Sequence, residues 1–142
     1  MKPFLLDVNV LVALLWPTHV HNRAAHRWFA KNRSAGFRTC PITQAGLTRI
    51  ICHPRYSRDH VTAGEAQRIL SELLALPEHA FWPDDLTLAE AIEKAGPISG
   101  HQQITDAYLV ALATMHGGLV ATFDRSMLGL RGAKGTVELV VS

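Results

Sequence analysis

The sequence has little cysteine and no long uninterrupted apolar segment. Cys40 and Cys52 are the only cysteines among 142 residues, and their setting matches neither a disulfide framework nor a zinc site. We therefore expect two buried, reduced thiols in a cytoplasmic protein. The apolar stretch at residues 4–16 is interrupted by Asp7 and Asn9 and lacks a cleavage site of small residues. It therefore predicts neither a signal peptide nor a membrane span.

Internal repeats, low-complexity tracts and linker-like segments are also absent from the sequence. With 48% hydrophobic residues, the chain has enough apolar side chains to bury a sizeable core without disulfide bonds or structural metal ions. We therefore predict a single domain that spans residues 1–142.

Acidic residues are scarce in the first part of the chain. Residues 1–58 contain nine lysines and arginines but only one acid, whereas residues 59–142 contain five basic and eleven acidic side chains. This asymmetry indicates a polyanionic partner for the basic part. It is equally consistent with arginines that lie on solvated helix faces or pair with acids of the second part. Charge alone leaves both interpretations open.

Short apolar segments alternate with helical patterns along the chain. Strands are predicted at residues 4–6, 36–40, 79–82, 119–122 and 137–141. Helices are predicted at residues 10–15, 20–31, 41–51, 62–76, 86–95 and 105–116. Strands that alternate with helices imply crossover connections and a parallel sheet. The predicted fold class is therefore α/β, with a central parallel sheet flanked by helices on both faces.

Several polar residues are placed to begin helices. Asn9 is predicted to cap the helix at residues 10–15. Thr62 with Glu65 forms a capping-box pattern. Asp84 or Asp85 is predicted to cap the helix at residues 86–95, which is a structural role rather than a chemical one.

Two carboxylates lie at opposite ends of the segment at residues 104–126. Asp106 is in the first turn of the predicted helix, Asp124 directly follows the strand, and Gly117-Gly118 reverses the chain between them. Ten residues of helix and five or six of strand both span roughly 15 Å. The helix start and the strand end therefore lie at one edge of the sheet, where ligands bind in open α/β sheets.

A third carboxylate, Asp7, follows the first strand at the same edge. The second strand ends there too, which brings Thr43 and Gln44 of the next helix to this edge. Each acid alone could end a strand, start a turn or favour a helix start, but these roles do not explain why three share one edge. Three carboxylates repel one another unless a metal ion joins them, and hard oxygen ligands suit Mg²⁺ or Mn²⁺. A hard cation beside a basic half-chain fits metal-assisted hydrolysis of a phosphodiester.

The histidines do not form a recognisable metal site. His19, His21 and His26 match no tetrahedral zinc pattern, and we expect them on the surface. His101, five residues before Asp106, is close enough to the acidic edge to contact a phosphate. The tryptophans stand beside apolar runs and are expected in the core.

Four segments together resemble the PIN-domain nucleases and, among them, the VapC-type toxins of bacterial toxin–antitoxin pairs. They are LLDVNVLVAL at 5–14, PITQAGLTRI at 41–50, ITDAYLVALA at 104–113 and TFDRS at 122–126. The resemblance implies a magnesium-dependent endoribonuclease, with Mn²⁺ as a substitute, whose metal-binding and catalytic acids are Asp7, Asp106 and Asp124. It also implies a supporting role for Thr122, a homodimer, and a cognate antitoxin that occupies the active-site groove.

Gln44 departs from the family's pattern, which usually has a glutamate in this helix. An amide oxygen can orient water or a ligand but brings no charge, so the number of metal ions stays open. Asn9 and His101 are further candidates for supporting roles. Arg49, Arg55 and Arg58 are candidate contacts for RNA phosphates.

Two other functions compete with a ribonuclease. A haloacid dehalogenase-type phosphatase also has an aspartate after its first strand, but it needs a second acid two residues later, where this chain has Asn9. The stronger alternative is a PIN-fold module that binds RNA or a protein partner without cleavage. Metal-dependent scission of RNA distinguishes the enzyme from the module. The RNA, the bond that is cut and the antitoxin are not encoded in any motif of the chain.

Overall fold

The computed structural model describes residues 1–56 and 60–141, and the elements in these ranges follow the predicted order. The strands are β1 (Phe4–Leu6), β2 (Phe37–Thr39), β3 (His79–Phe81), β4 (Leu119–Thr122) and β5 (Val137–Leu139). The α-helices are α1 (Val8–Leu15), α2 (Asn22–Asn32), α3 (Pro41–Ile51), α4 (Ala63–Leu74), α5 (Leu88–Ala95) and α6 (Ile104–Met115). Short 3₁₀ turns are η1 (Arg33–Ala35), η2 (His101–Gln103), η3 (Arg125–Gly129) and η4 (Arg131–Ala133).

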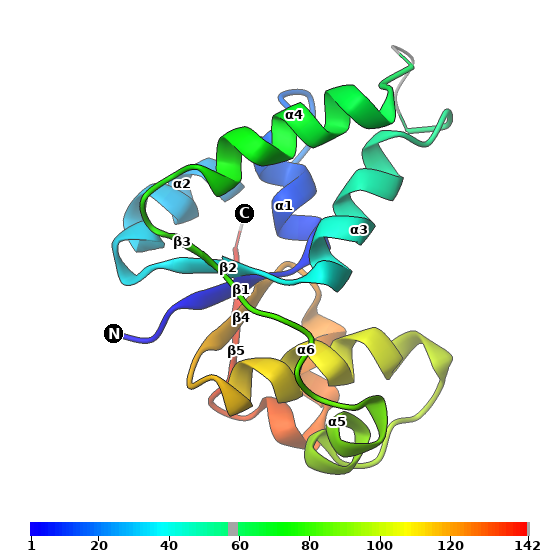
Figure 1. Cartoon of the computed structure of the whole chain (residues 1–142). Helices are drawn as coiled ribbons and strands as arrows, with labels where there is room; N and C mark the ends of the chain where they lie inside the picture. The colour runs from blue at the N-terminus through cyan, green and yellow to red at the C-terminus, as the bar shows by residue number, and fades with distance from the viewer. Residues whose placement is uncertain (57–59, 142) are drawn as a thin grey trace.

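The five strands form one parallel sheet in the order β3-β2-β1-β4-β5 (Figure 1). β1 is central and pairs with β2 on one side and β4 on the other. The chain first adds strands on the β2 side and then crosses over to β4, so the direction of winding changes between β1 and β4. In open α/β sheets, ligands bind at the carboxyl ends of the strands at such a point. The topology thus indicates a ligand site at the carboxyl ends of β1 and β4.

Helices cover both faces of the sheet, as predicted (Figure 1). Phe4 and Leu6 of β1 point into a core built with α1 to α4, whereas Leu5 between them points into a second core built with α5 and α6. This alternation follows from the two-residue repeat of a strand. Both faces are apolar around the central strands, which explains why β1 (FLL) and most of β4 (LVAT) are continuous hydrophobic runs.

α6 is the most completely buried helix on its face of the sheet. Every residue from Ala107 to Ala113 is buried. Gly117 then adopts φ +70°, a conformation that favours glycine, and the Gly118 amide donates a 2.8 Å hydrogen bond to the carbonyl of Ala113. A side chain at Gly118 would come within 2.8 Å of the Pro3 carbonyl oxygen, so the chain can return into β4 only with glycine there. The predicted helix–reversal–strand unit is confirmed.

The prediction that Asn9 caps the first helix was wrong. α1 begins two residues earlier, at Val8, and its N-cap is Asp7, whose Oδ1 accepts a 2.8 Å hydrogen bond from the Val8 amide. Asp7 has an extended backbone (φ −64°, ψ 157°) because it directly follows a strand. The first polar residue after β1 therefore takes the cap, and Asn9 lies within the first turn of the helix.

The prediction that Asp84 or Asp85 caps the fifth helix was also wrong. α5 begins at Leu88, and the Thr87 hydroxyl accepts a 3.2 Å hydrogen bond from the Glu90 amide. Thr87 and Glu90 form the same capping pattern as Thr62 and Glu65 of α4, where the prediction is confirmed.

The basic first half of the chain is partly neutralised within the fold. Arg33 makes a bidentate pair with Glu78 at 2.8 and 2.9 Å, which matches the interpretation that arginines pair with acids of the second half. Arg23, Arg27 and Lys31 lie exposed on α2, which matches the solvated-helix interpretation for those residues.

The cysteines and tryptophans lie less deeply than expected. Cys40 is buried and Cys52 only half-buried, and both are free thiols. Trp82 is buried, whereas Trp16 and Trp28 are half-buried. Over residues 1–56 and 60–141, none of the helices has the length and hydropathy needed to cross a bilayer.

Candidate acidic site at the carboxyl edge of the sheet

The three predicted acids lie at the carboxyl edge of the sheet, around the point where the winding reverses. Asp7 follows β1, Asp124 follows the adjacent strand β4, and Asp106 is in the first turn of α6. The Asp7 amide donates a 3.0 Å hydrogen bond to the carbonyl of Ala121, which ties the end of β1 to β4. Asp106 interacts electrostatically with both other carboxylates. The structure therefore places all three acids at one edge of the sheet, within electrostatic range of Asp106.

Thr122 is the centre of the polar network that joins these elements. Its buried hydroxyl donates a 2.7 Å hydrogen bond to Oδ2 of Asp7. The Thr122 hydroxyl oxygen also accepts hydrogen bonds from Nδ2 of Asn9 at 3.1 Å and from the Asp124 amide at 3.0 Å. Asn9 in turn accepts a 3.2 Å hydrogen bond from the Phe123 amide through Oδ1. Thr122 and Asn9 thus hold the ends of β1 and β4 in a fixed relationship, a role that fits their prediction as supporting residues.

Two of the three acids, Asp7 and Asp106, have a raised pKa. Burial raises the pKa of Asp7, although the hydrogen bonds from Thr122 and Val8 oppose that shift. Burial and the negative charges of Asp7 and Asp124 raise the pKa of Asp106 to about 6. Burial and the neighbouring negative charges disfavour the ionised carboxylate, and a nearby cation would reverse the effect of those charges.

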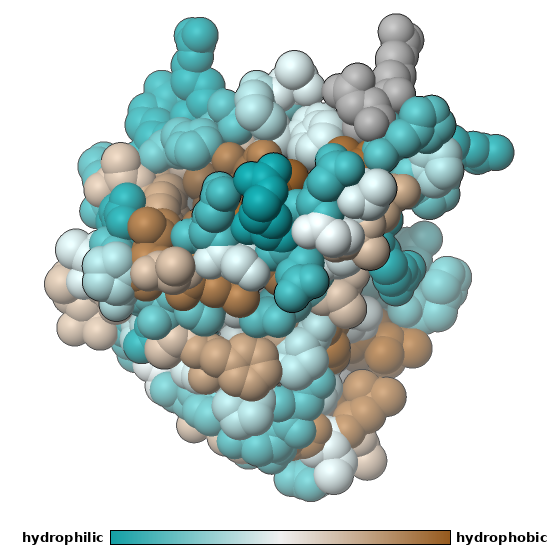
Figure 2. Space-filling model, turned by 45° about the horizontal axis from the view of Figure 1, so that its top comes forward, coloured by the Kyte–Doolittle hydropathy of each residue, from teal (hydrophilic) through white to brown (hydrophobic). Residues whose placement is uncertain are grey.

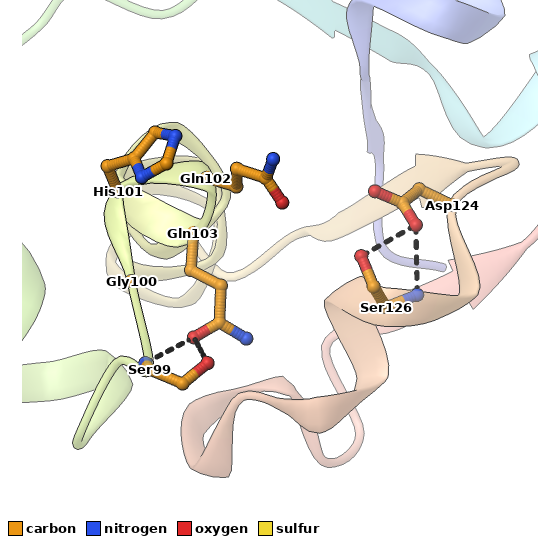
Figure 3. Close-up of a pocket in the computed structure, with 7 residues that line it drawn as sticks. All are labelled: Ser99, Gly100, His101, Gln102, Gln103, Asp124 and Ser126. Carbon is orange, nitrogen blue, oxygen red and sulfur yellow. Dashed lines mark hydrogen bonds between the residues drawn. The ribbon is translucent and has the colours of Figure 1, made fainter.

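Asp124 is exposed and held in place by its own turn. Its Oδ1 accepts a 2.9 Å hydrogen bond from the Ser126 amide and a 2.7 Å bond from the Ser126 hydroxyl (Figure 3). The other carboxylate oxygen points away from Ser126 (Figure 3). Asp124 therefore presents one oxygen to the open side of the site.

The carboxylate oxygens of this site suit a divalent cation that keeps several waters better than a cation enclosed entirely by protein ligands. In the ranges that the structure describes, no three His, Cys, Asp or Glu side chains are arranged to hold a metal ion together. Mg²⁺ does not require such a cage, because it keeps several waters and binds through one or two carboxylates together with substrate phosphates. The outward oxygen of Asp124 and the half-buried carboxylate of Asp106 are ligands of the required type. The metal-ligand roles of the acids stay predictions.

A polar groove of about 730 Å³ opens directly beside Asp124. One wall is the turn that precedes α6, and the other is formed by Asp124 and Ser126 (Figure 3). The lining residues are Ser99, Gly100, His101, Gln102, Gln103, Asp124 and Ser126. His101 thus lies beside the acidic site, where it was expected. The serines and glutamines of the groove could not be anticipated from the sequence, because only the approach of two distant turns brings them together.

Gln44 belongs to a different polar network from that of the acids. Its Nε2 donates a 2.9 Å hydrogen bond to the Thr39 hydroxyl, which also contacts Nε2 of His79 at 2.8 Å. This network connects α3 with β2 and β3, whereas the Thr122 network connects β1 with β4. Because the Gln44 side chain is hydrogen-bonded to Thr39, a neutral amide is accommodated at this helical position.

The candidate RNA-contacting arginines lie at the far end of α3. Arg49 is in the last turn of this helix, and Arg55 follows it. Both are exposed and line a cavity of about 320 Å³ together with Tyr56. Arg58 lies outside the described residues. α3 begins at the acidic edge and leads away from it for 11 residues, or roughly 16 Å, so these arginines would contact RNA beyond the acidic site (Figure 1).

The surface around this end of the molecule is chemically mixed. Figure 2 shows hydrophilic residues interspersed with hydrophobic ones on this face. An apolar groove of about 610 Å³ lies between α3 and α4 and includes Ala45, Cys52, Ala63 and Leu70.

An imidazole stack next to the acids was not anticipated from the sequence. The ring of His21 stacks on Phe123 with centroids 4.9 Å apart and planes 20° apart. Phe123 is the residue between Thr122 and Asp124. His21, expected as a surface residue, is in fact half-buried against the loop that carries Asp124.

Comparison with known proteins identifies the family. Residues 4–132 match the PIN domain family. The chain is 42% identical over 139 residues to Ribonuclease VapC39 of Mycobacterium tuberculosis, which covers 96% of this chain and 98% of the relative. It is 38% identical over 138 residues to Ribonuclease VapC38 of the same organism, with 96% of each chain covered.

A solved structure has the same fold. The crystal structure of VapBC2 from Rickettsia felis, bound to a DNA fragment from its promoter, contains a chain that superposes with a TM-score of 0.66. The match covers 96% of this chain and 98% of that chain at 13% sequence identity, so it bears on the fold alone. With the family match and the close relatives, it leads to one conclusion: this chain belongs to the PIN-domain family and, within it, to the VapC ribonucleases.

Proposed function

We propose that this protein is a Mg²⁺-dependent endoribonuclease and the toxin of a toxin–antitoxin pair. One observation carries the proposal: three carboxylates share the switch point of the sheet, where burial and the charges of Asp7 and Asp124 together raise the pKa of Asp106 to about 6. Such repulsion is costly for a structural site and useful for one that takes up a cation. The relatives named as ribonucleases supply the reaction class.

Asp7, Asp106 and Asp124 are the proposed metal-binding and catalytic acids. PIN-domain VapC nucleases generally depend on a divalent metal ion, and we propose Mg²⁺ here, with Mn²⁺ as a substitute. A bound divalent ion supplies Lewis-acid polarisation of a phosphoryl oxygen. The chain's own residues fix the geometry: Thr122 holds Oδ2 of Asp7, and Ser126 holds Oδ1 of Asp124. Their remaining lone pairs can then bind the cation without further side-chain ordering.

We propose one divalent ion per protomer in the absence of RNA. A fourth carboxylate would favour a second cation, but Gln44 contributes no charge and its amide is engaged with Thr39. A second ion, if it takes part, arrives with the negative phosphate of the substrate.

The partners follow from the same assignment. We propose RNA as the substrate, in the cytoplasm, and a cognate antitoxin that covers the acidic groove. The solved relative is a complex named VapBC2, which supports a partner protein of this kind. A homodimer is the proposed assembly of the toxin itself.

Incubation with structured RNA tests the enzymatic proposal. With Mg²⁺ the purified protein should cut RNA, and EDTA should stop the reaction. Excess Mg²⁺ added back should restore it. Tight binding of RNA without scission in Mg²⁺ or Mn²⁺ would instead identify a PIN-fold binding module.

A further inference from the structure

The groove beside Asp124 differs chemically from a phosphate-binding surface. Amide, hydroxyl and imidazole groups line it, together with one carboxylate, and the lining includes neither lysine nor arginine. The lining residues offer a phosphate no lysine or arginine, and the cation proposed at Asp124 belongs to the acidic site that borders the groove. A neutral ligand that offers both hydrogen-bond donors and acceptors suits the same walls.

Most polar groups on the walls are already engaged. Oε1 of Gln103 accepts hydrogen bonds from the Ser99 amide at 2.7 Å and the Ser99 hydroxyl at 3.0 Å, which fixes the turn before α6. On the opposite wall, Ser126 is engaged with Asp124. The groove is therefore bounded by two ordered turns that need no rearrangement to accept a ligand.

The side chains of His101 and Gln102 are the exceptions. Both are exposed, and neither makes a hydrogen bond with any part of the chain that the structure describes. In Figure 3 the amide of Gln102 extends across the groove toward Asp124. A carboxamide presents one acceptor and two donors side by side, the pattern that pairs in bidentate fashion with the N6 and N7 atoms of adenine.

We propose that this groove binds one unpaired adenine of the RNA substrate and that Gln102 sets the base preference next to the cleavage site. The inference rests on the proposed ribonuclease function. The volume of about 730 Å³ lies within the range of pockets that enclose small organic ligands. Proteins that read RNA sequence do so mainly on unstacked bases of single strands, through hydrogen bonds to their edges. Asp124 borders both the groove and the acidic site, so the base bound here belongs to a nucleotide adjoining the scissile phosphate.

A randomised single-stranded RNA library tests this assignment in two arms. In the first arm the library is cut in Mg²⁺ and the product ends are sequenced; in the second it is selected for binding in EDTA and sequenced. The wild type should enrich adenine at one position near the cut. Gln102→Met, which keeps the length of the side chain but removes the amide, should reduce that enrichment by about 5- to 150-fold, the equivalent of one bidentate amide–base pair. Gln67→Met, at an exposed glutamine of α4, is the matched control and should leave the enrichment unchanged.

The two arms separate this inference from the proposed function. The inference would be overturned if the Gln102→Met variant still enriched adenine. It would also be overturned if the wild type showed no adenine enrichment in the binding arm. An equal loss of cleavage at every sequence would also overturn it, because Gln102 would then support the reaction rather than select a base. If the wild type enriches adenine through Gln102 in EDTA but cuts nothing in Mg²⁺, the inference stands and the enzymatic proposal fails.

Discussion

Thr122 and Asp7 lie 115 positions apart in the sequence, and their side chains are joined by a 2.7 Å hydrogen bond. The hydroxyl of Thr122 also accepts from Asn9 and from the Asp124 amide, so one buried oxygen atom connects the ends of β1 and β4. Removal of this oxygen would loosen two of the three acids at once. The residue is therefore a positioning residue for the proposed site.

Thr122→Val should destabilise the protein and impair RNA cleavage. The substitution preserves shape but leaves Asp7, Asn9 and the Asp124 amide each without one hydrogen-bond partner, at a cost of about 1–3 kcal/mol in unfolding free energy. Urea unfolding measures that cost. Thr122→Ser keeps the hydroxyl and should retain most of both stability and cleavage. Equal behaviour of the two variants would show that the hydroxyl does not position the acids.

Asp106→Asn should stabilise the metal-free protein at neutral pH and remove part of its pH dependence. The folded pKa of about 6 lies above the ordinary value of 3.8, so the folded state binds more protons between these values. Stability from this group is therefore greatest below pH 4 and is lost as pH rises toward 6 and beyond. Allowing for solvent screening of a half-buried group, the gain at pH 7 should be on the order of 1 kcal/mol. Thermal unfolding in EDTA from pH 4.5 to 7.5 measures it, and a less stable variant at pH 7 would contradict the assigned repulsion.

The convergence of the acids could be predicted because parallel sheets constrain it. When every strand points the same way, residues that follow strands and residues that begin the next helices must share one edge. Asp7, Asp106 and Asp124 occupy such positions, so their sequence spacing alone places them together. The fold class follows from the same alternation of strands and helices.

Two of the helix caps and the groove could not be predicted in the same way. The N-cap is the last residue in the extended conformation before the helix, and this residue was Asp7 rather than Asn9 for α1 and Thr87 rather than Asp84 or Asp85 for α5. The groove forms where the turn before α6 approaches the turn after β4, a contact that no local pattern encodes. The stack of His21 on Phe123 likewise depends on tertiary packing.

Gly46→Ala should destabilise the fold by bringing α1 and α3 into collision. A β-carbon at Gly46 would lie 2.6 Å from Cγ2 of Val8, too close for two carbon atoms. We expect a loss of about 1–3 kcal/mol, as for other overpacked contacts. Val8→Ala in the same chain should recover part of that loss, because the sites are directly coupled.

Gly64→Ala is the matched control for this substitution. Gly64 lies in α4, where the nearest atom to an added β-carbon is 3.9 Å away. Stability should rise there by roughly 0.5–1 kcal/mol, because alanine favours the helix. If Gly46→Ala gave the same gain, the close approach of α1 and α3 would be refuted.

Neutralising Arg49 and Arg55 should reduce the salt dependence of RNA binding. If both arginines contact phosphates, Arg49→Gln/Arg55→Gln should lower the slope of log affinity against log salt by about 1.4, or 0.7 for each contact with a single strand. Binding is measured in EDTA to prevent cleavage. Arg68→Gln, at an exposed arginine of α4 paired with Glu72, serves as the control. An unchanged slope in the double variant would exclude the end of α3 from the RNA surface.

The most direct test of the acidic site is the cleavage rate of Asp7→Asn with Mg²⁺. Asparagine has nearly the same volume and is an equally good helix N-cap, so α1 and the fold should persist. Circular dichroism and urea unfolding establish that persistence, and Glu93→Gln on exposed α5 controls for the loss of one negative charge. The account predicts that Asp7→Asn abolishes RNA scission while Glu93→Gln cuts at the wild-type rate. Wild-type cleavage by a folded Asp7→Asn variant would contradict the assignment of the site.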